Sequence, residues 1–164
     1  MRLPEQKLWD RLSSMMVGSW DACRIESRVE KSAPDVYFSH HEVHGWLELK
    51  VYSPPTRSST KFAIRSWTAG QQAWARRFAE SLTPVWLVVH FAGTQKIYVV
   101  GALDALVVQN AVSVEEFESR FQDQCVHWLN RDPHVMLDVL QDSWFNSCVA
   151  AATAPRTLKL VPKQ

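Results

Sequence analysis

The sequence predicts an α/β fold in which a central mixed β-sheet is flanked by helices. Runs of β-branched, aromatic and other apolar residues are typical of strands, and they occur at 36–38, 45–51, 85–91 and 95–100. Apolar residues recur at helical spacing over 5–16 and 68–81. Helices and strands mixed along the chain in this way favour helices packed on a sheet.

Length and composition indicate a single domain. The chain has 164 residues, of which 46% are hydrophobic and 21% charged, as in ordinary globular proteins. We predict one domain over 1–149, with a core over about 19–100, a helical extension over about 102–149 and a flexible tail over 150–164. No segment is apolar enough to span a bilayer and no signal core is evident, which predicts an intracellular, cytoplasmic protein without membrane contact. Three widely spaced cysteines predict buried thiols rather than a zinc site or disulfides.

The first half of the chain predicts a helix, a hairpin, a loop and a second helix, in that order. The helix at 5–16 has an apolar side formed by Leu8, Trp9, Leu12, Met15 and Met16. The polar stretch 39–45 ends in glycine and predicts a hairpin between the first two strands. The loop 53–60 either closes over a nucleic acid or only connects two elements. Thr68-Ala69-Gly70-Gln71 matches a capping box, which predicts the start of the second helix.

The last third of the chain predicts helices. Ser113-Val114-Glu115-Glu116 matches a capping box that opens a helix to about Asn130. Asp132-Pro133 supplies a cap and a first-turn proline for another helix, to about Asn146. Acidic residues outnumber basic ones between 102 and 147, so we predict a packing or partner-binding role for this part rather than DNA contact.

Charged residues on the strand at 45–51 are the main functional signal. Side chains two apart share a face of a strand, so Trp46, Glu48 and Lys50 point one way, while the apolar residues between them point the other and can be buried against a helix. Antiparallel pairing with the strand at 36–38 would bring Asp35 toward Glu48. Two carboxylates placed in this way can converge on one divalent cation.

The chemistry of such a site is phosphodiester hydrolysis. Magnesium prefers oxygen ligands and keeps several waters, so one or two carboxylates together with substrate phosphate oxygens suffice to bind it. The bound cation polarises the phosphoryl group and lowers the pKa of the attacking water. Lys50 would add positive charge for the transition state or orient that water. The alternative is an exposed ion pair between Glu48 and Lys50, with Asp35 as a turn residue.

In these residues the chain resembles the PD-(D/E)xK nuclease superfamily. Pro34-Asp35 and Glu48-Leu49-Lys50 stand at its two signature positions. The closer resemblance is to virus-type replication-repair nucleases (VRR-NUC) and phage-encoded Holliday-junction-resolvase-like proteins. It is carried by Arg24-Ile25-Glu26, by Gly45-Trp46-Leu47-Glu48-Leu49-Lys50, and by Gln71 or Gln72 at the start of a helix that leads into an apolar strand. The match covers about 19–100.

The resemblance implies a restriction-endonuclease-like core and a Mg²⁺- or Mn²⁺-dependent DNA nuclease. It implies that the metal ligands are Asp35, Glu48 and the Leu49 carbonyl, that Lys50 aids the attacking water, and that Glu26 and Gln71 support catalysis. Branched DNA is one candidate substrate, in recombination, repair or phage DNA processing. Such resolvases act as dimers, which implies a homodimer. Two simpler explanations stay open, because Glu26 can pair with neighbouring arginines and the cap alone explains Gln71.

Basic residues gather next to the candidate catalytic strand although the net charge is only +1. Between 51 and 79 the chain has no Asp or Glu. We predict phosphate contacts from the cations of this stretch, Arg57, Lys61, Arg65, Arg76 and Arg77. The alternative is a solvated loop and helix face.

Two functions of other classes remain open from sequence. One is a catalytically inactive nuclease-like protein that binds nucleic acid or a partner protein. The other is an interaction protein that uses its acidic helices to recruit another chain. RNA as substrate and exonucleolytic action are also compatible with the sequence.

Overall fold

The computed structural model describes residues 4–16, 18, 20–25, 32–40, 43–80, 83–106, 111–127, 138–140 and 142. The longer elements are helices α1 (Pro4–Met15), α2 (Ala69–Glu80) and α4 (Val114–Arg120), and strands β1 (Trp20–Arg24), β2 (Val36–His40), β3 (Val43–Tyr52), β5 (Val85–Phe91) and β6 (Lys96–Gly101). The shorter ones are β4 (Lys61–Phe62), α3 (Ala102–Ala105), β7 (Val112–Ser113), a 3₁₀ turn (Gln122–Gln124) and β8 (Cys125–His127).

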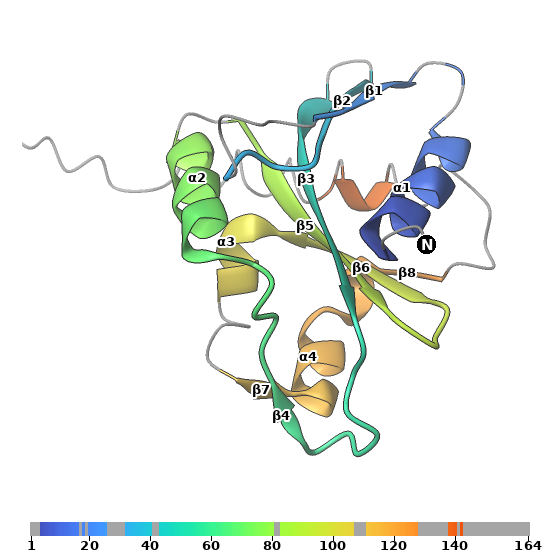
Figure 1. Ribbon diagram of the computed structural model, residues 1–164, viewed down its shortest axis with the longest axis vertical. Helices are drawn as coiled ribbons and strands as arrows, with labels where there is room; N and C mark the ends of the chain where they lie inside the picture. The colour runs from blue at the N-terminus through green and yellow to red at the C-terminus, as the bar shows by residue number, and fades with distance from the viewer. Residues whose placement is uncertain are drawn as a thin grey trace, which may run out of the picture.

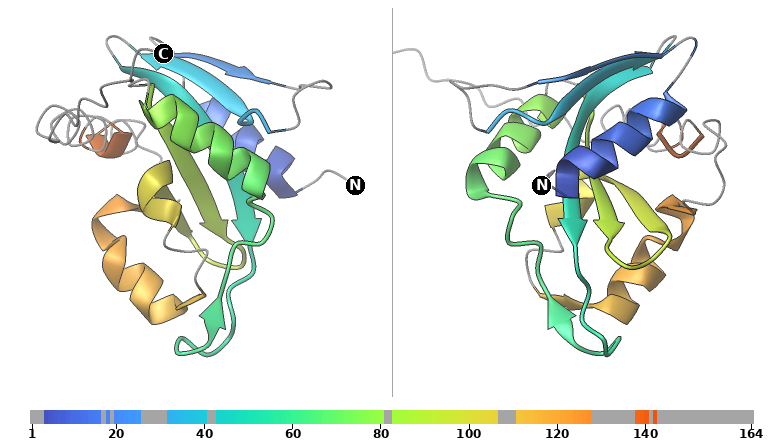
Figure 2. Two further views of the ribbon diagram at one scale, coloured as in Figure 1. Left: turned by 90° about the vertical axis from the view of Figure 1, so that its left-hand side faces the viewer. Right: turned by 45° about the vertical axis from the view of Figure 1, so that its right-hand side comes forward.

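The centre of the molecule is a six-stranded mixed sheet in the order β1-β2-β3-β5-β6-β8. Only β3 and β5 are parallel, joined by a crossover through α2, and the other neighbours are antiparallel. Strands β4 and β7 form a separate two-stranded sheet. Helix α1 covers one face of the large sheet, and α2, α3 and α4 lie on the other (Figure 1, Figure 2). The predicted α/β class and the mixed central sheet are therefore confirmed.

Both faces of the sheet are buried, which follows from the apolar residues on each. Leu8 and Leu12 of α1 pack with Leu47 and Leu49 of β3. On the other face, a cluster includes Trp74 and Ala75 of α2, Phe117 of α4, and Leu87, Val89 and Val100 of the sheet. Strand β3 is consequently enclosed between helices, and polar groups on it are withdrawn from water.

Gly45 lets the hairpin strands approach β5 closely. A Cβ at this position would lie 2.5 Å from the Pro84 carbonyl oxygen and 2.5 Å from the Trp86 ring. The Trp46 amide donates to the same Pro84 oxygen at 3.0 Å. The antiparallel hairpin predicted around the polar stretch is formed by β2 and β3, in the register Val36↔Leu47.

The C-terminal third differs from the sequence prediction. The helix expected from Ser113 to about Asn130 starts as predicted, with the Ser113 Oγ accepting the Glu116 amide at 3.1 Å, but ends at Arg120. The chain then adds β8 to the exposed edge of β6. Edge pairing satisfies backbone groups that a longer helix would leave open on β6. Of the helix expected from Asp132, only 138–140 and 142 are described, and they are helical; the tail 150–164 lies outside the described residues.

Two smaller points concern the cysteines and the membrane. The prediction of buried thiols is wrong for Cys23, which is exposed, whereas Cys125 is partly buried.

Among the described residues, no helix is both long and apolar enough to cross a bilayer.

Candidate active site

Glu48 and Lys50 lie together on the α2 side of β3. The predicted alternation holds, since Leu47 and Leu49 pack on the opposite face with α1. Glu48 is 2% and Lys50 6% exposed, and the Lys50 Nζ donates to the Glu48 Oε1. The alternative of an exposed surface ion pair is therefore wrong. A buried pair of this kind is costly to form because both charges lose water, so its presence is weak evidence of a stabilising role.

Asp35 reaches the same place from the neighbouring strand. It directly precedes β2, and because Val36 pairs with Leu47, Asp35 stands level with Glu48. Its Oδ2 accepts the Leu49 amide at 2.8 Å. The negative charge of Asp35 contributes to a raised pKa of Glu48, as expected for adjacent carboxylates.

The Leu49 carbonyl lies outside the ladder between β2 and β3. The Trp46 amide donates to Pro84 and the Tyr52 carbonyl accepts from Ala92, so even-numbered residues of β3 direct their backbone groups toward β5. Leu49 is odd-numbered and directs its amide to Asp35 on the other side. Both backbone groups of one strand residue point the same way. The Leu49 carbonyl therefore points toward the side of β3 on which Asp35 lies. At this level β2 has already ended, so no β2 residue pairs with Leu49.

Gln71 connects the start of α2 to Glu48. Its Oε1 accepts the Thr68 amide at 2.9 Å, and the Thr68 Oγ1 accepts the Gln71 amide at 3.3 Å, which is the predicted capping box. This assigns the amide orientation, and the Nε2 donates to the Glu48 Oε1 at 2.6 Å. Gln72 instead donates to the Trp67 carbonyl. Gln71, not Gln72, is the glutamine at the site, and one side chain combines the capping contact with contact to Glu48.

The two oxygens of Glu48 differ in their surroundings. Oε1 accepts hydrogen bonds from both Lys50 and Gln71, whereas Oε2 is buried and accepts from no donor group among the described residues. The pKa of Glu48 is raised from 4.5 to about 7, chiefly by burial. The Lys50 ammonium opposes the shift, and Asp35 adds to it through its negative charge and through a hydrogen bond between the two carboxyl groups. A buried, ionised carboxylate with one oxygen that lacks a donor is destabilised by the loss of water. A bound cation would offset this cost, so the site favours cation binding.

A hard divalent cation fits this donor set. The groups that would hold it are all oxygens: the Asp35 carboxylate, the Glu48 Oε2 and the Leu49 carbonyl. The described residues contain no group of three or more His, Cys, Asp or Glu side chains that could hold a metal. Two carboxylates are enough for Mg²⁺, which takes its remaining ligands from water and phosphate. Glu26, the third predicted carboxylate, lies outside the described residues; the amide of Ile25 donates to the Asp35 carbonyl at 2.8 Å.

The predicted DNA-contacting cations are all exposed. Arg57 lies in the loop after β3, Lys61 on β4 and Arg65 shortly after it, whereas Arg76 and Arg77 lie on α2. Loop 53–60 joins β3 to β4. On the inner side of α2, Trp74 is buried and stacks on Phe78 with a centroid distance of 3.6 Å, so these two rings belong to the core.

One contact at the site had no signal in the sequence. Gly70, at the start of α2, leaves room for Ser32, because a Cβ there would lie 2.6 Å from the Ser32 Oγ. The segment that leads into Asp35 therefore packs against the turn of α2 that carries Gln71. The two positions are far apart in the chain, and the capping box that contains Gly70 does not indicate a contact with Ser32.

Comparison with known proteins finds solved structures that are similar to this chain. No family model matches the sequence, and no curated protein matches it. A structure of Hjc, a Holliday junction resolvase from the archaeal hyperthermophile Archaeoglobus fulgidus, is similar with a TM-score of 0.40 and 14% identity, over 71% of this chain and 97% of that one. Similarity of this extent assigns no family, and the VRR-NUC resemblance stays a prediction.

Proposed function

We propose that this protein is a Mg²⁺- or Mn²⁺-dependent nuclease that hydrolyses DNA phosphodiester bonds. The observation that supports this most strongly is the buried Oε2 of Glu48, which accepts from no donor group among the described residues and lies on the carboxylate beside Asp35. Buried polar atoms normally have a hydrogen-bond donor or an ion as partner, and two adjacent carboxylates without a donor favour a cation. An open, desolvated carboxylate oxygen is what a metal ligand requires.

Each residue has a separate task in this proposal. Asp35 and the Glu48 Oε2 bind the metal, with the Leu49 carbonyl as third protein ligand. When bound, the metal polarises the scissile phosphate and acidifies a water. Gln71 and Lys50 hold the Glu48 Oε1, which leaves Oε2 for the metal. The Lys50 ammonium, placed beside that carboxylate, supplies positive charge to the phosphoryl oxygens or orients the attacking water.

The exposed cations near β3 and on α2 would bind the DNA backbone. Phosphate contacts of this kind give affinity without base readout. We propose branched DNA as the preferred substrate, a role in recombination, repair or phage DNA processing, and a homodimer that works inside the cell. Glu26 is proposed as a supporting catalytic residue.

The test is cleavage of labelled linear, nicked, flapped and four-way-junction DNA with Mg²⁺ or Mn²⁺. Glu48→Gln and Lys50→Met should abolish cleavage while the protein stays folded. The matched control is Glu118→Gln, because Glu118 also pairs with a lysine, Lys96 at 2.6 Å, but lies on α4. Cleavage that survives Glu48→Gln would overturn the proposal.

The second candidate is an inactive nuclease-like protein that binds nucleic acid or a partner. It is favoured by the presence of only two metal-type side chains among the described residues of the site. Metal binding seen by calorimetry, together with DNA binding but no cleavage of any of the four substrates, would support it over the nuclease.

A further inference from the structure

A cavity open to solvent lies on the opposite face of the sheet from Glu48. It measures about 410 Å³ and lies between α1 and strands β3 and β5. Val51 and His90 are register partners on these strands and form its floor with Leu8 of α1. The volume is within the range of small-molecule sites and exceeds what an inorganic ion needs.

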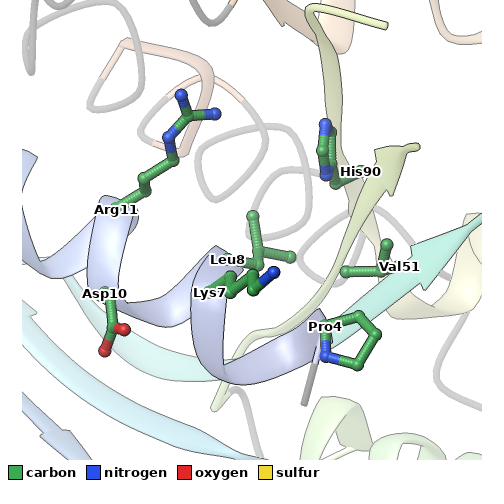
Figure 3. Close-up of a pocket in the computed structure, with 7 residues that line it drawn as sticks. All are labelled: Pro4, Lys7, Leu8, Asp10, Arg11, Val51 and His90. Carbon is green, nitrogen blue, oxygen red and sulfur yellow. The ribbon is translucent and has the colours of Figure 1, made fainter. Parts of the chain in front are cut away.

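The cavity carries basic side chains on two of its sides. Lys7 and Arg11 are one helical turn apart on α1, so they project from the same side of the helix. His90 faces them from β5, and Figure 3 shows Arg11 and His90 on opposite sides of the opening with Lys7 and Leu8 between them. Both Lys7 and Arg11 are exposed at the cavity mouth.

The acidic residue of the lining is directed elsewhere. The Asp10 Oδ1 accepts the Gln6 Nε2 at 2.8 Å, a contact along α1. Figure 3 shows the Asp10 carboxylate pointing away from His90 and Lys7. Among the described lining residues, those on the side of the cavity that faces β5 are therefore basic or apolar.

The positive charge of Arg11 acts on His90. Burial lowers the pKa of His90 below 6.5, and the positive charge of Arg11 lowers it further. The ring is consequently neutral at pH 7, and Arg11 and Lys7 carry the positive charge of the cavity. An anion between α1 and β5 would be attracted by both charges.

We propose that this cavity binds an organic phosphate of about mononucleotide size, with Lys7 and Arg11 holding the phosphate and Leu8 and Val51 contacting the apolar part. The ligand is either a free mononucleotide or one nucleotide unit of a nucleic-acid strand, since both present the same phosphate. The inference stands apart from the nuclease proposal, because it uses the other face of the sheet and needs no metal.

The experiment is a ¹H–¹⁵N NMR titration of the full chain in EDTA with dAMP, with adenosine and with a short oligothymidylate. We expect dAMP or the oligonucleotide to shift the backbone amides of Val51 and His90, and adenosine, which lacks the phosphate, to shift neither. A response to dAMP identifies a free nucleotide as a ligand, and a response to the oligonucleotide alone identifies a strand.

Variants decide whether the shifts report the cavity. Lys7→Gln and Arg11→Gln should each weaken binding about tenfold, the loss expected for one charge-assisted hydrogen bond. Arg120→Gln removes an exposed arginine from α4 and should change nothing. The proposal is overturned if the amides of Val51 and His90 do not shift, or if the Gln71 side-chain amide shifts instead of them. It is also overturned if adenosine causes the same shifts as dAMP, or if Arg120→Gln weakens binding as much as the two cavity variants do.

Discussion

At the scale of single residues, Glu48 couples the protonation of the site to its stability. The pKa of Glu48 is raised from 4.5 to about 7, chiefly by burial. Between these two values the folded protein binds more protons than the unfolded chain, so the free energy of unfolding falls as pH rises. For the metal-free protein we expect a loss of roughly 3 kcal/mol from pH 4.5 to 7 attributable to this residue.

Urea unfolding in EDTA at several pH values measures this loss. Glu48→Gln removes the titrating group while keeping the side-chain shape. The unfolding free energy of the wild type minus that of the variant should therefore fall by roughly 3 kcal/mol from pH 4.5 to 7. A difference that stays constant from pH 4.5 to 7 would contradict a raised pKa. Addition of Mn²⁺ at pH 7 should restore stability to the wild type only, because the cation binds the ionised carboxylate.

Gln71 provides a second prediction at this scale, because its two contacts have different consequences. Gln71→Ala removes both the cap and the hydrogen bond to the Glu48 Oε1, so we expect about 1 kcal/mol lower stability and a 10- to 100-fold lower cleavage rate. Ser113→Ala is the matched control, since Ser113 caps α4 through a similar contact. It should lower stability by a similar amount without changing cleavage. Equal losses of activity in both variants would show that Gln71 acts only through folding.

At the scale of elements, the predictable parts are those with a local signal. The alternation of β3 places Glu48 and Lys50 on one face, and the two capping boxes place Gln71 and Glu116 in the first turns of α2 and α4. These signals suffice because strand period and helix start depend on neighbouring residues. The end of α4 depends instead on β8 pairing with the edge of β6, a contact between distant segments. The sequence pattern predicts neither strand β1 nor the β4–β7 pair, because these strands also depend on pairing with other segments of the chain.

The same distinction applies to the site. The approach of Glu48 and Lys50 follows from their spacing on one strand. The hydrogen bond from Gln71 to Glu48 depends on the parallel pairing of β3 with β5, which brings α2 over the sheet, and no local pattern encodes it. Only the resemblance to a nuclease family pointed to Gln71 as a neighbour of the site. The burial of Glu48 and the unsatisfied Oε2 likewise emerge only from tertiary packing.

Gly45 gives a prediction about the contact between the β2–β3 hairpin and β5. Gly45→Ala places a methyl group 2.5 Å from both the Pro84 carbonyl oxygen and the Trp86 ring, so the hairpin or β5 has to move. We expect a loss of about 1–3 kcal/mol, measured by urea unfolding. Because Glu48 follows on the same strand, cleavage should fall as well. A variant as stable as the wild type would contradict the close packing.

At the scale of the whole molecule, charge is distributed unevenly although the net charge is +1. The exposed cations cluster in the segments after β3 and on α2, whereas α4 and the residues after it carry acids. If DNA lies along the basic segments, its affinity depends on salt through the release of counterions. Each proposed contact between a cation and a phosphate then adds its own increment to the slope of log affinity against log salt concentration.

Fluorescence anisotropy with duplex DNA, in a Glu48→Gln background that prevents cleavage, tests this distribution. Lys61→Gln and Arg76→Gln should each lower the magnitude of the salt slope by about 0.9, the value for one phosphate contact on B-DNA. Arg120→Gln is the charge-matched control on α4 and should leave the slope unchanged. If all three variants change the slope equally, net charge rather than a defined DNA path controls binding. If none does, the phosphates are held by other residues, and the basic segments are only a solvated surface.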